Sequence, residues 1–193
     1  MNRVEPIRDK RKIVAIKNLL KGAERWRDYT LFVLGINFGL RIDDLLKLQV
    51  KDVLDESGEI KDRFTIVEGK TKKSNTIKIN DSAKEAIRLL FDNTDIKDDL
   101  KNHLIYNTKE PYKPIHRVSA HRLVNQICSE VGIKNIAIGT HTLRKTWGYH
   151  AHKAGISIEV IQAKYMHQST ATTRRYLGIE QKDVSAAYDT VNL

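Results

Sequence analysis

The stretch "GTHTLRKTWGYHAH", residues 139–152, predicts a helix with basic side chains on one face. His141 and Arg144 are three residues apart, which places both side chains on the same side of a helix. A guanidinium offers a forked pair of N–H donors that suits phosphate oxygens, and an imidazole beside it could contact the same anion. Taken alone, such a pair is more often a solvated helix face, so its meaning depends on the rest of the chain.

The chain as a whole carries an excess of positive charge. Its 193 residues include 34 Lys and Arg against 24 Asp and Glu, a formal net charge of +10. This balance favours a polyanionic partner, nucleic acid foremost, although the lysines are spread along the chain, as in a merely soluble basic protein. The length fits one domain, and residues 1–193 are interpreted as a single domain.

The composition also predicts a compartment. Cys128 is the sole cysteine, so no intrachain disulfide can form, and it lies in an apolar pattern that predicts burial. The N-terminus lacks the apolar core of a secretory signal, and the most apolar run, "YTLFVLGINFGL", is shorter than the roughly 20 residues that span a bilayer. A soluble, cytoplasmic protein is expected.

The periodicity predicts a mainly α (α+β) fold, a helical bundle with one small antiparallel sheet. "RFTIVEG" and "TIKIN" are rich in β-branched residues and flank "KTKKSN", which predicts a hairpin with a lysine-rich tip. Ser82 and Glu85 have the spacing of a capping box at a helix start. Helical spacing predicts helices over residues 8–21, 25–38, 40–53 (a short one), 81–93, 116–132, 140–154, 157–166, about 169–177 and about 180–190.

The sequence predicts neither a cofactor nor a metal. It has no glycine-rich nucleotide loop and no C-x-x-C pair. His141 and His152 would lie roughly 16 Å apart along one helix, and His150 would fall on the opposite face, so the three cannot share an ion. Asp43 and Asp44 are helix neighbours that point about 100° apart, which makes a metal-dependent nuclease site a weak interpretation.

Two motifs resemble the tyrosine recombinases, or phage-type integrases, whose catalytic domain is shared with type IB topoisomerases. "FGLRIDDLLKL" resembles the first motif of that family, and implies that Arg41 is a catalytic arginine with Asp44 as its acidic support. "THTLRKT" resembles the second motif, His-x-Leu-Arg, and implies catalytic roles for His141 and Arg144.

A third motif and the hairpin complete the resemblance in the family's order. "YMHQSTATTRRY" resembles the segment that carries a histidine and, nine residues later, the nucleophilic tyrosine, here His167 and Tyr176. Tyr165 and Tyr188 are rival tyrosines, but they lack this spacing. "EGKTKKSN" resembles the family's catalytic hairpin and implies Lys70 as the catalytic lysine. Another register would assign that role to Lys72 or Lys73.

The resemblance implies a site-specific recombinase that cleaves and rejoins double-stranded DNA through a 3′-phosphotyrosyl intermediate, without metal or ATP. A tyrosine phenol has a pKa near 10 and a phosphodiester repels anions, so the chemistry needs positive groups. Arg41 and Arg144 would neutralise the nonbridging oxygens, His141 and His167 would supply hydrogen bonds and manage protons, and Lys70 would protonate the leaving 5′-oxygen.

The resemblance also implies partners. "HRVSAHRLVNQ" is the helix most suited to a DNA groove, and most DNA contacts should go to phosphates. Val184, Ala187 and Val191 have helical spacing, which implies a C-terminal helix that docks into a neighbouring subunit of a DNA-bound homo-oligomer, a tetramer. A helix packed on its own domain would look the same. The alternatives are a non-catalytic DNA-binding or regulatory relative, and relaxation of the topoisomerase type.

Two departures from the family pattern stand out. Met166 replaces the usual glycine before His167, and we expect the backbone there to avoid a positive φ. Many integrases carry a helical DNA-clamping domain ahead of the catalytic one, whereas here only 40 residues precede Arg41. The chain is therefore either a shortened form of a longer recombinase or a short, single-domain relative such as the fimbrial phase-variation recombinases.

Overall fold

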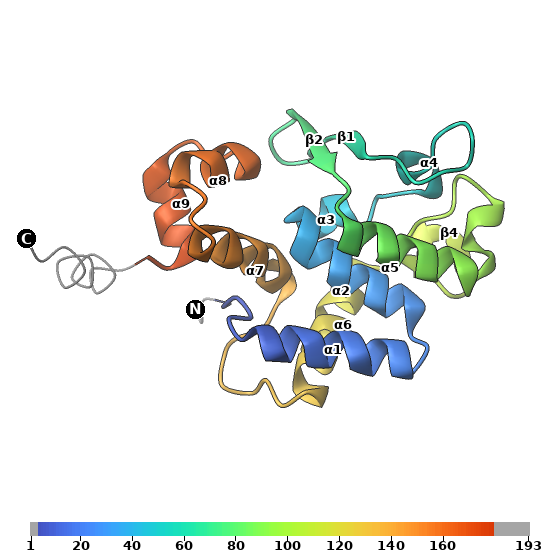
Figure 1. Cartoon of the computed structure of the whole chain (residues 1–193), viewed down its shortest axis with the longest axis horizontal. Helices are drawn as coiled ribbons and strands as arrows, with labels where there is room; N and C mark the ends of the chain where they lie inside the picture. The colour runs from blue at the N-terminus through green and yellow to red at the C-terminus, as the bar shows by residue number, and fades with distance from the viewer. Residues whose placement is uncertain (1–3, 180–193) are drawn as a thin grey trace, which may run out of the picture. The chain divides into compact units, whose positions relative to one another are not determined.

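The computed structural model of the protein describes residues 4–179 (Figure 1). Within this range the predicted helices are confirmed with small shifts at their ends, except that the short helix expected over residues 40–53 is two helices. The helix expected over residues 180–190 lies outside the described residues. The elements are α1 (Lys10–Gly22), α2 (Trp26–Phe38), α3 (Ile42–Leu45), α4 (Val50–Val53), β1 (Arg63–Val67), β2 (Ser74–Lys78), α5 (Asp81–Asp92), the 3₁₀ helix η1 (Asp95–Asp98), β3 (Tyr106–Asn107), β4 (Glu110–Pro114), α6 (Arg117–Glu130), α7 (Thr140–Lys153), α8 (Ile158–Tyr165) and α9 (Thr170–Leu177).

The chain packs into two compact units, residues 1–147 and residues 148–193, and the boundary falls inside α7. The first holds α1 to α6, both sheets and the first turns of α7, and the second holds the end of α7 with α8 and α9.

Helix α2 is the centre of the first unit and packs along α5 and α1 (Figure 1). Its segment from Tyr29 to Leu34 is buried all round, as expected for a helix that is apolar on every side. Each fully buried Leu or Phe contributes about 1.5–3 kcal/mol relative to exposure. Cys128 is buried in the same core as predicted, and this burial raises the pKa of its thiol to about 12.

The start of α5 differs from the sequence interpretation. The N-cap residue is Asn80, whose side-chain oxygen accepts from the N–H of Ala83 at 3.0 Å. The proposed capping box of Ser82 and Glu85 is wrong, because Glu85 lies inside α5 and binds Lys21 of α1 instead. Ser82 and Glu85 do have the spacing of a capping box, but Asn80, the residue before the helix, is the one that caps it.

The structure contains two small antiparallel sheets in the described range, where the sequence interpretation expected one. The predicted hairpin is confirmed: β1 pairs with β2, with Thr65 opposite Thr76 and their hydroxyls 3.0 Å apart. The second sheet joins β3 to β4, with a register shift between Tyr106 and Asn107. A two-residue strand carries no alternating pattern, so periodicity could not reveal it.

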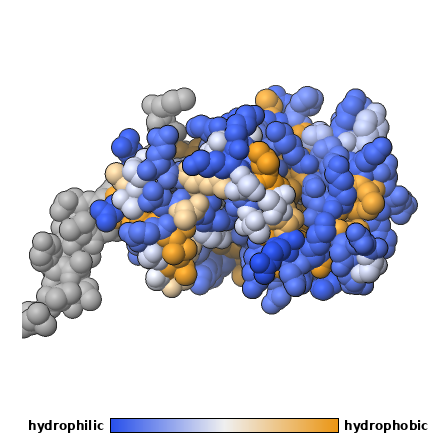
Figure 2. All heavy atoms as spheres, turned by 90° about the horizontal axis from the view of Figure 1, so that it is seen from above, coloured by the Kyte–Doolittle hydropathy of each residue, from blue (hydrophilic) through white to orange (hydrophobic). Residues whose placement is uncertain are grey.

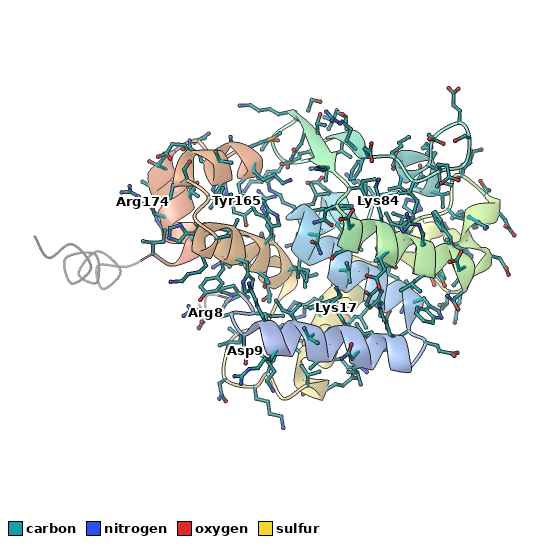
Figure 3. The ribbon with its side chains drawn as sticks, in the orientation of Figure 1. Arg8, Asp9, Lys17, Lys84, Tyr165 and Arg174 are labelled. Carbon is teal, nitrogen blue, oxygen red and sulfur yellow. The ribbon has the colours of Figure 1, made fainter. Side chains whose placement is uncertain are left out.

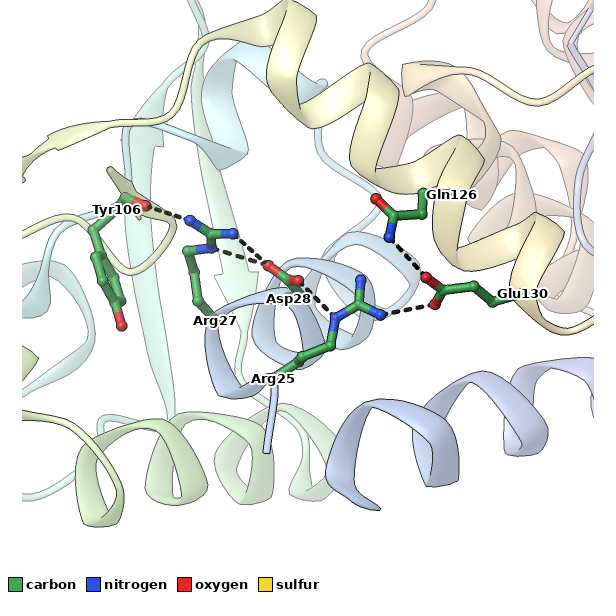
Figure 4. Close-up of polar contacts among 6 residues, drawn as sticks. All are labelled: Arg25, Arg27, Asp28, Tyr106, Gln126 and Glu130. Carbon is green, nitrogen blue, oxygen red and sulfur yellow. Dashed lines mark hydrogen bonds and ion pairs between the residues drawn. The ribbon is translucent and has the colours of Figure 1, made fainter. Parts of the chain in front are cut away.

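An ionic network fixes α6 to the beginning of α2 (Figure 4). Asp28 is buried and accepts from Arg25 Nε at 3.0 Å and from Arg27 Nη2 at 2.8 Å. Arg25 also binds Glu130 at the end of α6, at 2.7 Å, and Gln126 donates to the same carboxylate. Because Arg25 and Asp28 are largely shielded from water, this network fixes the position of α6 better than a surface ion pair would.

The second unit has defined helix ends. The side chains of Ser157 and Ser169 cap α8 and α9, each accepting from a backbone N–H three residues ahead. Met166, which follows α8, has φ 52° and ψ 39°. The expectation that this position avoids a positive φ is therefore wrong: the backbone adopts the turn that a glycine would make, and the N–H of His167 bonds to the carbonyl of Gln162 at 3.1 Å. Tertiary packing must offset a cost of roughly 1–2 kcal/mol for this conformation.

One face of the described residues is largely hydrophilic. Figure 2 shows one face on which blue, hydrophilic side chains predominate and hydrophobic ones are scattered. Among residues 4–179, no helix combines the length and the apolar character needed to cross a bilayer.

Candidate active site

The turn between α2 and α3 places Arg41 beside α7. Gly39 ends α2 with a φ of 57°, a conformation that glycine adopts without strain. A Cβ atom on Gly39 would lie 3.1 Å from the indole of Trp147, so this residue also permits the close approach of α7. Arg41 follows as the N-cap of α3.

Arg144 is a buried charge in the first unit. Its side chain is on the inner face of α7, 2% exposed, and Nη1 donates to the Gly39 carbonyl at 2.9 Å. A guanidinium stays protonated in proteins, so its burial is costly unless its donors are used. The predicted pair His141 and Arg144 thus has one member buried against the first motif, and the solvated-face alternative does not hold for Arg144.

Arg41 forms an ion pair with a residue that the sequence analysis did not select. Its Nη1 binds Oε2 of Glu68, and the two side chains are 16% and 0% exposed. A signal for Glu68 did exist: Phe64, Ile66 and Glu68 alternate along the hairpin strand, so a carboxylate falls on its inward face. What the sequence could not show is that Arg41 is the partner.

Asp44 is buried rather than a surface acid. It is 5% exposed, and Oδ1 accepts from the backbone N–H of Gly69 at 2.9 Å. Glu68 and Gly69 are the two residues that precede Lys70. The hairpin is therefore held to the Arg41 segment at two adjacent points.

Lys70 lies at the exposed tip of this hairpin. Lys72 and Lys73 are exposed as well, and Lys72 has a φ of 57° in the tight turn. The chain segment on the Glu68 side is anchored, which leaves the lysine side chains facing solvent. All three remain candidates for the predicted acid, with Lys70 nearest in sequence to the anchored residues.

His141 lies in the first turn of α7 in a strongly positive environment. Desolvation of the ring is the largest cause that lowers its pKa below 6.5, followed by the positive charges of Arg144, Arg117, Lys145 and Arg41. Part of the side chain is exposed, so the direction of this shift matters more than its size. At neutral pH the imidazole is uncharged, so it can both donate and accept a hydrogen bond.

In the second unit, His167 and Tyr176 lie together. Their ring centroids are 5.3 Å apart, and Tyr165 contacts both rings, at 5.1 Å from His167 and 5.3 Å from Tyr176. His167 Nδ1 lies 3.0 Å from the hydroxyl of Thr173, which fixes the ring orientation. Figure 3 labels Tyr165 and also Arg174, whose exposed side chain extends from α9.

Tyr165 is the one rival of Tyr176 that lies within the described residues. Tyr165 is 0% exposed and Tyr176 is half-buried, so Tyr176 is the better placed to reach a phosphate. Tyr188 lies outside the described residues.

The predicted residues thus divide between the units. The first unit brings together the Arg41 segment with Asp44, the base of the Lys70 hairpin, and the α7 residues His141 and Arg144. The second brings His167 and Tyr176 together.

Comparison with known proteins identifies the family to which the chain belongs. A model of the phage integrase family matches residues 9–182. The chain belongs to the phage integrase family. The probable integrase/recombinase YoeC of Bacillus subtilis (strain 168) is 40% identical over 188 residues, which are 97% of this chain and 97% of YoeC.

Solved structures of tyrosine recombinases have the same fold. The crystal structure of XerA recombinase superposes with a TM-score of 0.75 at 18% identity, covering 100% of this chain and 66% of XerA. XerH bound to its palindromic difH substrate, a post-cleavage complex, gives 0.72 at 17% identity, covering 96% of this chain and 53% of XerH. The phage integrase chain described here has the fold of a tyrosine recombinase catalytic domain and spans only part of these longer proteins.

Membership of the phage integrase family confirms the resemblance found in the sequence. The roles of Arg41, Lys70, His141, Arg144, His167 and Tyr176 remain predictions, as does the supporting role of Asp44. The hydrogen bond that Asp44 accepts comes from the backbone of Gly69, the residue before Lys70.

Proposed function

We propose that this protein is a site-specific DNA recombinase that breaks and rejoins DNA strands through a covalent link to Tyr176. The observation that carries the proposal is the buried guanidinium of Arg144, held on the Gly39 carbonyl two residues before Arg41. A fold has no need to bury an arginine there for stability, whereas a site for a phosphodiester does. Family membership and the names integrase and recombinase borne by YoeC support the same activity.

In the proposed first step, the Tyr176 oxygen attacks the scissile phosphorus and the bond to the 5′-oxygen breaks. The phenolic proton passes to a neutral imidazole, and the leaving 5′-oxygen takes a proton from Lys70. The product is a 3′-phosphotyrosyl link that a free 5′-hydroxyl reverses, so the energy of the bond is conserved. Arg41 and Arg144 stabilise the extra negative charge on the nonbridging oxygens in the transition state.

The histidines suit this chemistry for different reasons. His141 is uncharged at neutral pH because its surroundings lower its pKa, so it can accept a proton near the clustered arginines. His167 lies against the Tyr176 ring in its own unit, where it can donate a hydrogen bond to the same phosphate. These groups supply all of the proposed proton transfers, and the proposal requires neither metal nor ATP.

Double-stranded DNA is the proposed substrate. The net charge of +10 supplies phosphate contacts, and a structural neighbour of the same fold, the Tn1549 transposon integrase, has been solved in complex with a circular intermediate DNA. The proposed groove-facing surface is the exposed side of α6, together with its exposed N-cap residue His116; Arg117 and Val118 are the first exposed residues of the helix. We further propose that residues 1–193 act as one catalytic domain and assemble as a tetramer on DNA. The C-terminal helix invoked for that assembly lies outside the described residues.

A covalent adduct provides the test. The protein is incubated in EDTA with nicked duplexes from a random-sequence pool, and the products are separated by denaturing electrophoresis. We expect an adduct with the wild type and none with Tyr176→Phe. Tyr112→Phe is the matched control, because Tyr112 is an exposed tyrosine on β4 and should leave the adduct intact. Binding to DNA on a native gel without any adduct would favour the non-catalytic alternative.

A further inference from the structure

Glu68 is a fully buried carboxylate that no step of the proposed mechanism uses. It follows β1 at the base of the lysine hairpin, and its Oε2 binds Arg41 Nη1. Its other oxygen, Oε1, accepts from Asn75 Nδ2 at 2.7 Å, and Asn75 is itself buried. Both carboxylate oxygens are therefore engaged, one by a proposed catalytic group and one by the hairpin.

The backbone around Glu68 is also fixed. Its N–H donates to the Lys73 carbonyl at 3.0 Å, and its carbonyl accepts from the N–H of Lys72 at 2.9 Å. The next residue, Gly69, donates to Asp44. With its backbone held on both sides and both carboxylate oxygens bonded, the Glu68 side chain has a fixed position beside Arg41.

This rigidity decides between two possible roles. A mobile carboxylate beside Arg41 would compete with the phosphate for the guanidinium. A fixed one instead orients the guanidinium plane, because Arg has five N–H donors and Glu68 engages Nη1, which leaves other donors for the substrate. The buried pair is also weak evidence for stability as such, since apolar residues of similar size often serve a core equally well.

We propose that Glu68 is a positioning residue for Arg41: it fixes the guanidinium for the scissile phosphate and couples that orientation to the hairpin that carries Lys70. This inference rests on the proposed function, and it adds a residue to which the catalytic motifs give no role. Charge is part of the role, because a neutral amide of the same shape would hold Arg41 less firmly.

The test compares two substrates in single-turnover adduct formation. One has the ordinary scissile phosphodiester, and the other has a methylphosphonate, in which a methyl group replaces one nonbridging oxygen and removes the negative charge. A neutral phosphorus centre no longer needs the arginine that neutralises it. We expect Glu68→Gln to slow the reaction of the diester by roughly tenfold to a hundredfold, as for a small misplacement of a reacting group. With one diastereomer of the methylphosphonate substrate, Glu68→Gln should react nearly as fast as the wild type.

Three further variants make the result specific. Arg41→Ala should show the same substrate pattern with a larger loss on the diester. Asn75→Ala keeps the carboxylate but removes its second partner, so it should show the pattern with a smaller loss, and it carries the test if Glu68→Gln does not fold by circular dichroism. Glu59→Gln, an exposed glutamate between α4 and β1, should match the wild type on both substrates.

The outcomes separate the inference from the function on which it rests. If a folded Glu68→Gln or Asn75→Ala loses equal activity on both substrates, or loses none, Glu68 does not act through Arg41 and the inference is overturned. If the wild type forms no adduct with any DNA although it binds DNA, the proposed function fails, and the inference fails with it.

Discussion

Replacing Gly148 with alanine should destabilise the second unit, although alanine favours helices. Gly148 lies inside α7, where Ala in place of Gly is favourable by about 1 kcal/mol on helix propensity alone. A Cβ atom at this position, however, would lie 2.3 Å from the Tyr165 hydroxyl and 2.7 Å from Leu177 Cδ2. Overpacking of this kind costs about 1–3 kcal/mol, and two contacts this short call for the upper part of that range.

The net expectation for Gly148→Ala is a loss of about 2 kcal/mol, equivalent to a fall in Tm of roughly 4–8 °C for a chain of this length. Thermal unfolding followed by circular dichroism measures it. The effect should also reach Tyr176, because Tyr165 contacts that ring and must move to admit the methyl group. We therefore expect slower adduct formation as well.

Two controls isolate the steric cause. Gly22→Ala changes another helical glycine, at the end of α1, where a Cβ atom would meet no atom within 4 Å, so it should be neutral or stabilising. Tyr165→Phe in the Gly148→Ala background removes the hydroxyl that makes the shortest contact and should restore part of the lost stability. A Gly148→Ala protein as stable as Gly22→Ala would refute the packing argument.

Three other predictions concern single groups. The pKa of His141 is lowered in the folded state, so the unfolded state binds more protons just below pH 6.5. The free energy of unfolding therefore falls as the pH drops through that range. Urea titrations at pH 7.5 and 5.5 should show a smaller fall for His141→Gln than for the wild type. Met166→Ile should cost about 1 kcal/mol more than Met166→Leu, because a β-branched side chain tolerates a positive φ poorly, and equal melting temperatures would contradict this. Asp28→Asn should cost about 1–3 kcal/mol in urea unfolding, because it leaves Arg25 and Arg27 with a weaker partner, whereas an unchanged midpoint would mean that the network in Figure 4 adds no stability.

The sequence predicted those features that depend on local periodicity. Helices α1 and α2, and the hairpin of β1 and β2, repeat apolar or β-branched residues at a regular spacing, so they could be placed within a few residues. The start of α5 was missed because Asn80 and Ser82 are both good capping residues, and the sequence does not say which one the backbone uses. Met166 was misjudged because a positive φ there depends on tertiary packing.

In the candidate active site, too, the sequence predicted what depends on neighbouring residues and missed what depends on tertiary packing. The motifs selected Arg41 and Arg144 because their neighbours in sequence are characteristic. The partner of Arg41 could not be read this way: Glu68 lies 27 residues further on, and the two meet because the hairpin folds back onto α3. The inward alternation of β1 marks Glu68 as unusual, but the contact itself is a property of the fold.

The network of Arg25, Asp28 and Glu130 has a consequence for how such proteins can change. It fixes α6 through the last turn of that helix and the start of α2, while His116, Arg117 and Val118 lie exposed at the opposite end of the helix. Under the proposed function, substitutions of His116 and Val118 would alter which DNA sequence is preferred without loosening the helix that presents them. Arg117 differs from these two residues, because it pairs with Asp43 of α3 and its charge helps to lower the pKa of His141. Target preference could then drift in a lineage, or be redirected by design, while the groups that perform the chemistry stay as they are.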